Sequence, residues 1–411
     1  FLSAIMKNSQ SLLSIDEVLT ILLDAARPLE ALETVATEAA CGRILASDLR
    51  ATLDVPPHDN SAMDGYAVRI ADVGTHASLH VAQRIPAGST GSALQPGTAA
   101  RIFTGAPIPP DCDAVVMQED TTLNGEQVIL NKPLKPGQNI RRRGEDIAAG
   151  SIVLPAGKPL SPQDLGLAAS IGVATLPVRR LLRVAVFFTG DELVMPGQPL
   201  GAGQIYNSNR YVLRGLLQNL GCAVTDLGIV EDSLAATRAA LRDAATGHDL
   251  VLTCGGVSVG EEDHVKAAVE AEGRLDAWKI AIKPGKPLAF GHIGNTPFIG
   301  LPGNPVSAFI TFLLFATPFI KRSQGQTAVQ PQPLLAQADF DWTKPDKRQE
   351  YLRARISRDA AGKPVASLYP QQGSGVLTSC SWASGLIEVL PGQSIGKGEL
   401  VPYYPLSDLG C

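Results

Sequence analysis

The sequence lacks the cysteine spacing of zinc sites and of disulfide frameworks. Its six cysteines are scattered along 411 residues, and none of them belongs to a C-x-x-C pair. Because both kinds of site require paired cysteines, neither a structural zinc ion nor a disulfide-stabilised secreted domain is indicated. Scattered thiols favour a reducing, cytoplasmic location.

Long apolar runs and clustered positive charge are also missing. No run of about 18 apolar residues occurs, and the first residues lack the charged start and unbroken apolar core of a signal peptide. The formal net charge is −5 at pH 7, whereas nonspecific binding to nucleic acid depends on clustered Lys and Arg. We therefore expect neither a membrane nor a nucleic acid as a partner.

Aromatic residues make up only 5% of the chain, whereas it contains 40 glycines and 30 prolines. Hydrophobic residues still account for 45% and occur in every segment. This composition indicates folded domains with many turns, and the length corresponds to about two to four domains. Internal repeats are absent. So is a Ser-His-Asp or Cys-His arrangement, and we expect no covalent enzyme intermediate.

The stretch of residues 251–266, VLTCGGVSVGEEDHVK, is typical of a buried strand, a glycine turn and the start of a helix. Gly255 and Gly256 would let bare backbone amides approach a ligand, and amides at a helix start favour anions such as phosphate. Three acidic residues follow, namely Glu261, Glu262 and Asp263. They either bind a divalent cation such as Mg²⁺ beside that anion or cap the helix dipole.

Strands and helices alternate between about residues 182 and 314. The predicted strands and helix starts are residues 183–188, 223–229 and 250–254, and the neighbourhoods of Ser208 and Ser233. This alternation predicts a parallel sheet in a three-layer α/β domain, where ligands bind beyond the carboxyl ends of the strands. Acidic loops follow all three strands, so we expect a ligand site at this edge.

Shorter β runs lie on both sides of this α/β segment. From about residue 49 the sequence is rich in turns, with strands predicted over 99–103 and 114–117 and a type I′ hairpin turn at Asn124-Gly125. Towards the C-terminus, runs at 351–356 and 386–390 predict a small β domain after a proline-rich linker.

Two helix starts are marked by their capping residues. Ser14 and Glu17 have capping-box spacing before a helix that ends by Pro28. In GLPGNPVSAFITF, Asn304 occupies a predicted N-cap and Pro305 the first position of a buried helix.

Polar motifs outside the sheet edge each have two interpretations. The loop with Asp54, Asp59 and Asp64 either contacts a ligand or satisfies its own backbone through Asx turns. The RRRGED motif of residues 141–146 either grips an oxyanion or forms a solvated salt-bridge loop. For Arg353 the alternatives are ligand contact and surface ion pairing.

Seven motifs occur in order along the chain. They are DNSAMDGYAV, FTGAP, NIRRRGED, TGDEL, GGVSVGEEDHV, WKIAIKPGKP and GLPGNPVSA. In order and spacing the sequence resembles the molybdopterin molybdenumtransferase family, the bacterial MoeA proteins and the animal gephyrin E domain, from about residue 12 onwards. The resemblance implies an Mg²⁺-dependent enzyme that inserts molybdate into adenylated molybdopterin, releases AMP and forms molybdenum cofactor.

The same resemblance implies four domains and an elongated homodimer in which loops of one subunit complete the partner's site. The domains would be a linking domain of residues 1–48 and 147–177, a β-rich insert of 49–146, a molybdopterin-binding α/β domain of 178–327 and a C-terminal small β-barrel domain of 328–411. Contact with the molybdopterin adenylyltransferase and other cofactor-assembly proteins is also implied.

Site residues follow from the resemblance position by position. Asp263 and Asp64 would hold the metal and act in catalysis together with Glu192 and Asp232. The substrate-binding residues would be Thr104, Arg141, Asp146, Gly255, Gly256, Ser258, Lys279, Lys283, Pro302, Pro305, Arg353 and Ser374.

Two alternative functions stay open at this point. Molybdopterin adenylyltransferases resemble the same α/β domain, but they consist of a lone domain of under 200 residues. A non-catalytic scaffold of cofactor assembly would leave the acidic loops without a role. Metal-dependent AMP release distinguishes the transferase from both.

Overall fold

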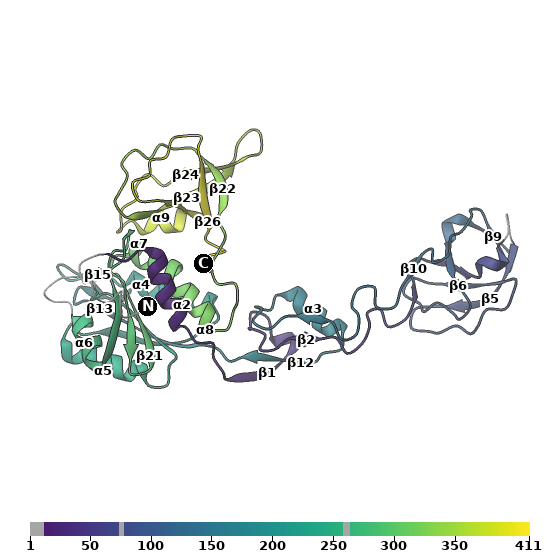
Figure 1. The fold of residues 1–411 in the computed structure, drawn as a ribbon, viewed down its shortest axis with the longest axis horizontal. Helices are drawn as coiled ribbons and strands as arrows, with labels where there is room; N and C mark the ends of the chain where they lie inside the picture. The colour runs from purple at the N-terminus through teal and green to yellow at the C-terminus, as the bar shows by residue number, and fades with distance from the viewer. Residues whose placement is uncertain (1–11, 74–77, 258–263) are drawn as a thin grey trace. The chain divides into compact units, whose positions relative to one another are not determined.

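The structure is a computed structural model that describes residues 12–73, 78–257 and 264–411. It divides into two compact units (Figure 1). The first unit contains the residues up to 33, residues 42–46 and residues 178–411, and the second contains residues 34–41 and 47–177. The chain passes from one unit to the other four times, and two of these crossings lie within β1 (Leu32–Ala36) and β12 (Thr175–Arg179).

A six-stranded sheet forms the centre of the first unit. In spatial order its strands are β16 (Ala223–Val230), β13 (Arg183–Thr189), β17 (Leu250–Cys254), β21 (Thr296–Leu301), β20 (Ala289–Ile293) and β18 (Gly273–Trp278). The first four strands are parallel, as the strand–helix alternation predicts. β20 pairs antiparallel with β21, and β18 pairs antiparallel with β20, so the sheet is mixed.

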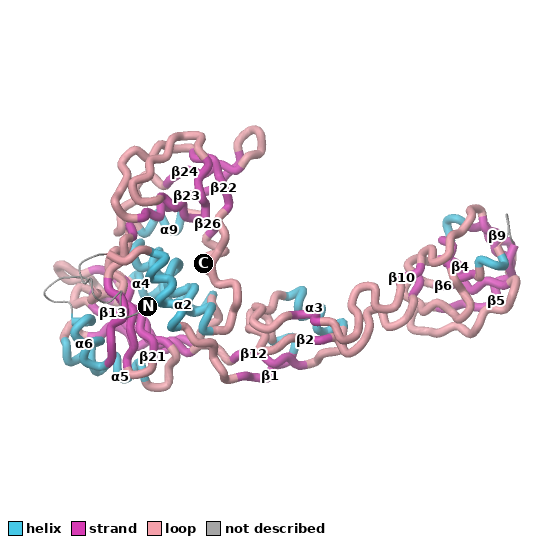
Figure 2. The backbone as a smooth tube through the Cα atoms, in the orientation of Figure 1, coloured by secondary structure: helices cyan, strands magenta, loops and turns pink. Residues whose placement is uncertain are grey.

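Helices cover both faces of this sheet, which confirms the three-layer α/β prediction (Figures 1 and 2). On one face lie α2 (Ile15–Ala25), α4 (Ser208–Asn219), α7 (Pro305–Thr311), the π-helix η4 (Phe312–Ala316) and α8 (Thr317–Ser323). On the other lie α5 (Leu234–Ala245) and α6 (His264–Glu272). Successive strand side chains point to opposite faces, so Val186 joins one core and Phe187 the other.

Local capping explains where these helices begin. Oγ of Ser14 accepts from the amide of Glu17 at 3.2 Å, and the Glu17 carboxylate accepts from the amide of Ser14 at 2.8 Å. This is the predicted capping box, although α2 already ends at Ala25. Residues 305–323 are helical, long and apolar enough to span a membrane by composition alone, but 83% of the stretch is buried inside the protein. This stretch is therefore a buried core helix in the part of the chain that the structure describes.

The C-terminal part of the first unit forms a small closed barrel. Around it run β23 (Gln349–Arg358), β24 (Pro364–Leu368), β22 (Leu334–Ala338), β26 (Leu400–Pro405) and β25 (Gly385–Val389), and β25 pairs again with β23. Its own apolar core and the pairing of β25 with β23 confirm the predicted C-terminal β-barrel. Two further elements are the helix α9 (Leu377–Trp382) and the strand β19 (Ile282–Lys283), which extends the sheet beside β23. The strands β14 (Leu193–Val194) and β15 (Ile205–Tyr206) form a separate small pair.

The second unit is built around another six-stranded sheet. Its strands in spatial order are β7 (Ala114–Met117), β4 (Gly65–Val68), β6 (Thr98–Ile102), β5 (Ser78–Ile85), β9 (Gln127–Leu130) and β8 (Thr121–Asn124). The remaining elements are β2 (Leu49–Arg50), β3 (Asn60–Ser61), β10 (Ile140–Arg141), β11 (Ile152–Leu154), α3 (Pro162–Ser170) and the 3₁₀ turns η1 (Thr37–Ala39), η2 (Ile70–Asp72) and η3 (Gln118–Asp120). Both predicted strands and the β8–β9 hairpin are present.

The type I′ assignment of that hairpin turn is wrong. Asn124 pairs with Gln127, so the two loop residues are Gly125 and Glu126. A type I′ turn needs positive φ at both positions, but only Gly125 has it, at 61°. Gly125 thus takes the first loop position, where φ is positive, and Asn124 is the last residue of β8.

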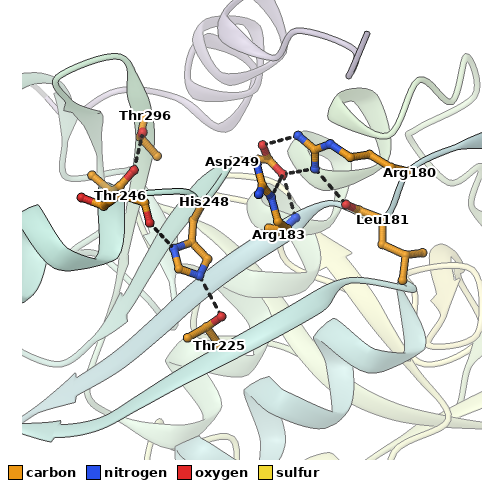
Figure 3. Close-up of polar contacts among 9 residues, drawn as sticks. Arg180, Leu181, Arg183, Thr225, Thr246, His248, Asp249 and Thr296 are labelled. Carbon is orange, nitrogen blue, oxygen red and sulfur yellow. Dashed lines mark hydrogen bonds and ion pairs between the residues drawn. The ribbon is translucent and has the colours of Figure 1, made fainter. Parts of the chain in front are cut away.

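Polar contacts fix the amino-terminal edge of the central sheet (Figure 3). Both oxygens of Asp249 accept from Arg180, at 2.6 and 2.7 Å. Nδ1 of His248 lies 3.1 Å from the carbonyl of Thr246, and Nε2 lies 2.7 Å from Oγ1 of Thr225. Because a carbonyl only accepts, Nδ1 is the donor in the contact with Thr246. Strands β13, β16 and β17 are thereby anchored at the edge away from the candidate site.

Candidate functional site

A cavity of about 450 Å³ lies at the carboxyl-terminal edge of the parallel strands. It is lined from the ends of β13, β17 and β21 and from the first residues of α4 and α7. Six of the predicted site residues line it, namely Glu192, Asp232, Gly255, Gly256, Pro302 and Pro305. The parallel topology therefore brings together residues that are far apart in sequence, at the edge where α/β sheets bind ligands.

The double-glycine turn leaves no room for side chains. Gly255 and Gly256 have φ values of 99° and 63°. A Cβ atom on Gly255 would lie 2.3 Å from the carbonyl oxygen of Thr189, and one on Gly256 would lie 2.6 Å from Cγ2 of Val265. The expectation of bare amides is wrong for Gly255, because its amide donates to the carbonyl of Leu301 at 3.1 Å.

The acidic residues expected to act together fall into three groups. Glu192 and Asp232 share the cavity, and the amide of Asp232 donates to Oδ1 of Asp191 at 3.4 Å. Asp64 belongs to the second unit. Asp263 lies outside the described residues, as do Ser258, Glu261 and Glu262. No group of three or more potential metal ligands occurs among the residues that the structure describes.

The two predicted lysines have different surroundings. Lys283 forms ion pairs with Glu350 at 2.7 Å and with Asp346 at 3.3 Å. Burial alone would lower the pKa of Lys283, but hydrogen bonding and charge pairing with both carboxylates raise it above its usual value. Lys279 forms no ion pair with any described residue and has a φ of 82°, in the left-handed region that favours glycine. Of these two lysines, Lys279 is therefore the one without an ion pair in the part of the chain that the structure describes.

Arg353 is fully buried in the barrel, which excludes the surface ion pairing considered for it. Its guanidinium donates to Oγ of Ser379 at 3.0 Å and to the carbonyl of Gly373 at 3.1 Å. Burial lowers the pKa of Arg353 to about 10. Ser374 directly follows Gly373, and its carbonyl accepts a hydrogen bond from the amide of Val306 at 3.0 Å. Arg353 thus supports the loop that carries Ser374 to the start of α7.

In the second unit Asp64 and Thr104 form a pair. Oδ1 of Asp64 accepts from both the amide and the hydroxyl of Thr104, each at 2.8 Å. These two hydrogen bonds, the one from the backbone first, hold the pKa of Asp64 below its usual value. Oδ2 of Asp64 has no hydrogen-bond partner within the described segments.

The RRRGED loop forms salt bridges through two of its three arginines. Arg142 contacts Asp59 at 2.5 Å and Arg143 contacts Asp54 at 2.6 Å. Backbone amides also bind these carboxylates, so the loop satisfies many of its own polar groups. Arg141 forms no ion pair with a described residue, and neither does Asp146. Glu145 also lacks an ion pair in this part of the structure, but its carboxylate accepts from the amide of Arg142 at 2.7 Å. Arg141 and Asp146, the two that the resemblance assigns to the substrate, have neither an ion pair nor a side-chain hydrogen bond with a described residue.

Among the polar residues that line the cavity, the sequence analysis did not assign Asn207, Asn209 and Cys254 to the site. Nδ2 of Asn209 donates to the carbonyl of Gly303 at 2.7 Å, and Sγ of Cys254 donates to the carbonyl of Pro302 at 3.0 Å. Burial raises the pKa of the Cys254 thiol to about 12. Asn207 caps α4 through its side-chain oxygen. The sequence pattern around Ser208 predicts only the start of a helix. The asparagines on either side, Asn207 and Asn209, are the sequence signal that could have indicated a polar cavity wall.

The architecture defines a class of proteins in which an α/β ligand-binding domain is combined with a separate β-rich unit and a small β-barrel. Three family profiles match the chain. Their descriptions are "MoeA N-terminal region (domain I and II)" for residues 13–172, "Probable molybdopterin binding domain" for 185–322 and "MoeA C-terminal region (domain IV)" for 336–406.

Individual relatives agree with these profiles. A Haemophilus influenzae protein named molybdopterin molybdenumtransferase is 44% identical over 375 residues, which cover 90% of this chain and 93% of that protein. Molybdopterin molybdenumtransferase 2 of Mycobacterium tuberculosis is 38% identical over 384 residues, with the same coverage. The crystal structure of the molybdopterin biosynthesis MoeA protein of Pyrococcus horikoshii has a TM-score of 0.84 and 28% identity, and covers 96% of this chain and 100% of that chain. The chain belongs to the molybdopterin molybdenumtransferase (MoeA) family.

Proposed function

We propose that this chain is a transferase that inserts molybdate into adenylated molybdopterin, releases AMP and requires Mg²⁺. One observation carries the proposal: a chain of this family has a cavity at its parallel strand ends that combines Glu192 and Asp232 with a double-glycine turn. The substrate and molybdate are both anions, so the site has to bring two negative groups together.

The residues of the chain fit a magnesium ion in their chemistry. Glu192 and Asp232 offer hard oxygen donors in the cavity, and Asp64 keeps Oδ2 without a hydrogen-bond partner among the described residues. The resemblance adds Asp263, and we propose that Asp263 and Asp64 hold the ion. When bound, Mg²⁺ would neutralise the phosphoanhydride and polarise its phosphorus.

The protein itself supplies position and charge. The glycine turn places the backbone of Gly255 and Gly256 at the cavity wall, and it needs glycine because a Cβ atom there would collide with Thr189 or Val265. Lys279 and Arg141 form no ion pair with a described residue, and their charges suit an oxyanion. Ser374 lies on a loop that Arg353 supports. Holding both reactants in reacting geometry would supply most of the rate enhancement.

We further propose a homodimer in which residues of the second unit, including Asp64 and Thr104, act in the partner subunit's site. Adenylated molybdopterin would be delivered by the molybdopterin adenylyltransferase or another cofactor-assembly protein. Both proposals rest on the family resemblance.

The deciding experiment supplies the purified chain with adenylated molybdopterin, Mg²⁺ and molybdate, and quantifies AMP and molybdenum cofactor. We expect both products, and we expect Glu192→Gln to lose them while keeping its circular dichroism spectrum. An adenylyltransferase would instead consume ATP and molybdopterin. A scaffold would release no AMP from adenylated molybdopterin and would not consume ATP and molybdopterin. That result would contradict the proposed activity.

A further inference from the structure

Arg101 binds the residue that follows Asp64 and a second residue whose amide binds the Asp64 carbonyl. Nη1 of Arg101 donates to the carbonyl of Gly65 at 2.9 Å, and Nη2 donates to Oε1 of Gln118 at 2.6 Å. The amide of Gln118 in turn donates to the carbonyl of Asp64 at 3.1 Å. One guanidinium therefore links the start of β4, the end of β6 and the turn η3 after β7.

Two aromatic rings hold the same guanidinium in place. Its central carbon lies 4.6 Å from the ring centroid of Phe103 and 5.2 Å from that of Tyr66. Phe103 directly precedes Thr104 in the chain, and Tyr66 directly follows Gly65. Cation–π contacts of this kind are attractive and orient the planar guanidinium. The residues that flank both members of the Asp64–Thr104 pair thus pack against Arg101.

The position of Asp64 depends on close strand packing. A Cβ atom on Gly65 would lie 1.9 Å from the carbonyl oxygen of Val116, so β4 approaches β7 too closely for any side chain there. Arg101 forms no ion pair with a described carboxylate. Its donors are directed to the carbonyl groups and the amide side chain that frame Asp64, and a lysine could not reproduce this arrangement because its ammonium lacks the planar fork.

We propose that Arg101 is a positioning residue that holds the Asp64 carboxylate and the Thr104 hydroxyl in their paired geometry for the substrate. The inference rests on the proposed function, because that function assigns Asp64 and Thr104 to the site. Arg101 acts through these two residues and needs no contact with the ligand of its own. Side chains that support a reacting group in this way commonly affect activity strongly.

Arg84 provides a matched control. Its guanidinium carbon lies 4.7 Å from the ring centroid of Phe103, yet among the described residues it forms neither an ion pair nor a hydrogen bond. Arg101→Lys and Arg84→Lys therefore keep the charge and remove one stacked guanidinium each, but only Arg101→Lys breaks the links to Gly65 and Gln118.

The first measurement is hydrogen exchange by mass spectrometry on peptides that cover residues 98–108. Arg101→Lys should speed exchange in the peptide that contains the Thr104 amide, whereas Arg84→Lys should leave it unchanged. Unchanged exchange in Arg101→Lys would overturn the positioning role. If this variant does not fold, Gln118→Leu should show a smaller increase, because it removes the Nη2 acceptor together with the exposed hydrogen bond from Nε2 of Gln118 to Glu119 and leaves the bond to Gly65 in place. The absence of that increase would overturn the role equally.

The second measurement is a double-mutant cycle on AMP release with Asp64→Asn. Arg101→Lys should lower kcat about 10- to 100-fold in the parent chain, the scale expected when a reacting group is misplaced. In the Asp64→Asn background the same substitution should have no further effect. Multiplicative losses would refute an action through Asp64. A parent-like kcat in Asp64→Asn, with faster exchange in Arg101→Lys, would instead refute the proposed role of Asp64 in the reaction.

Discussion

Nζ of Lys283 lies 2.7 Å from Oε1 of Glu350, whose side chain is only 2% exposed. The pair joins β19 to β23, which run parallel at this point. A buried carboxylate needs such a partner, because an unpaired charge in the interior is costly. Lys283 thus has a structural task in the barrel in addition to any contact with an anion, whereas Lys279 has no ion pair among the described residues.

Lys283→Ala should therefore destabilise the protein more than Lys279→Ala. Leaving the buried Glu350 acceptor without its cation should cost about 1–3 kcal/mol, whereas removing an unpaired surface charge should change stability by about 0.5 kcal/mol or less. Denaturant unfolding of the two variants checks this, and equal midpoints would contradict it. Lys279→Ala should instead raise the molybdate concentration needed for half-maximal AMP release.

Asp263→Asn should fold normally but lose Mg²⁺-dependent AMP release, because asparagine keeps the size and a capping oxygen while it removes the charge needed for the cation. Adenylated molybdopterin should accumulate. Glu270→Gln is the matched control, since it removes an exposed carboxylate from α6 whose one ion pair with a described residue is with Lys266 at 4.0 Å. AMP release at the parent rate in Asp263→Asn would return this residue to the role of a helix cap.

The active protein should sediment as a homodimer, with twice the chain mass of 43.2 kDa. If the second unit completes the partner's site, Asp64→Asn and Glu192→Gln subunits should each release AMP much more slowly than the parent and carry their lesions in different halves of a shared site. Mixing and re-equilibrating them should restore AMP release, because a mixed dimer contains one intact site. An active monomer, or a mixture that stays inactive, would contradict the shared site.

The free energy of unfolding should decrease at acid pH because Asp249 becomes protonated. Burial alone would raise the pKa of this carboxyl, but the hydrogen bonds from Arg180 outweigh it and hold the pKa below its ordinary value. A depressed pKa in the folded state means that the stabilisation is present at neutral pH and is lost as the pH falls below about 4. Asp249→Asn should lower stability at pH 7 and weaken its acid dependence, whereas the exposed control Asp243→Asn should do neither. Unfolding free energies measured between pH 3 and 7 test this.

Much of the fold could be predicted from local sequence signals. The capping box at Ser14, the strand at residues 250–254 and the hairpin after β8 each depend on residues a few positions apart, so their patterns are visible in the sequence. The order of strands and helices then requires a parallel sheet with a site at its carboxyl edge. The acidic loops of Glu192 and Asp232 follow from that topology.

Side-chain partners were decided by the tertiary structure. The antiparallel edge of β20 and β18, the closure of the barrel through β23 and β25, the burial of Arg353 and the pairing of Lys283 with Glu350 all join residues that local patterns do not connect. The sequence around a lysine is similar whether its side chain pairs with a buried carboxylate or forms no ion pair. The sequence by itself determined the helices and strands and the edge of the sheet at which the site lies. Packing decided which charged side chains form ion pairs, because the energy of an ion pair depends on distance and burial in the folded chain.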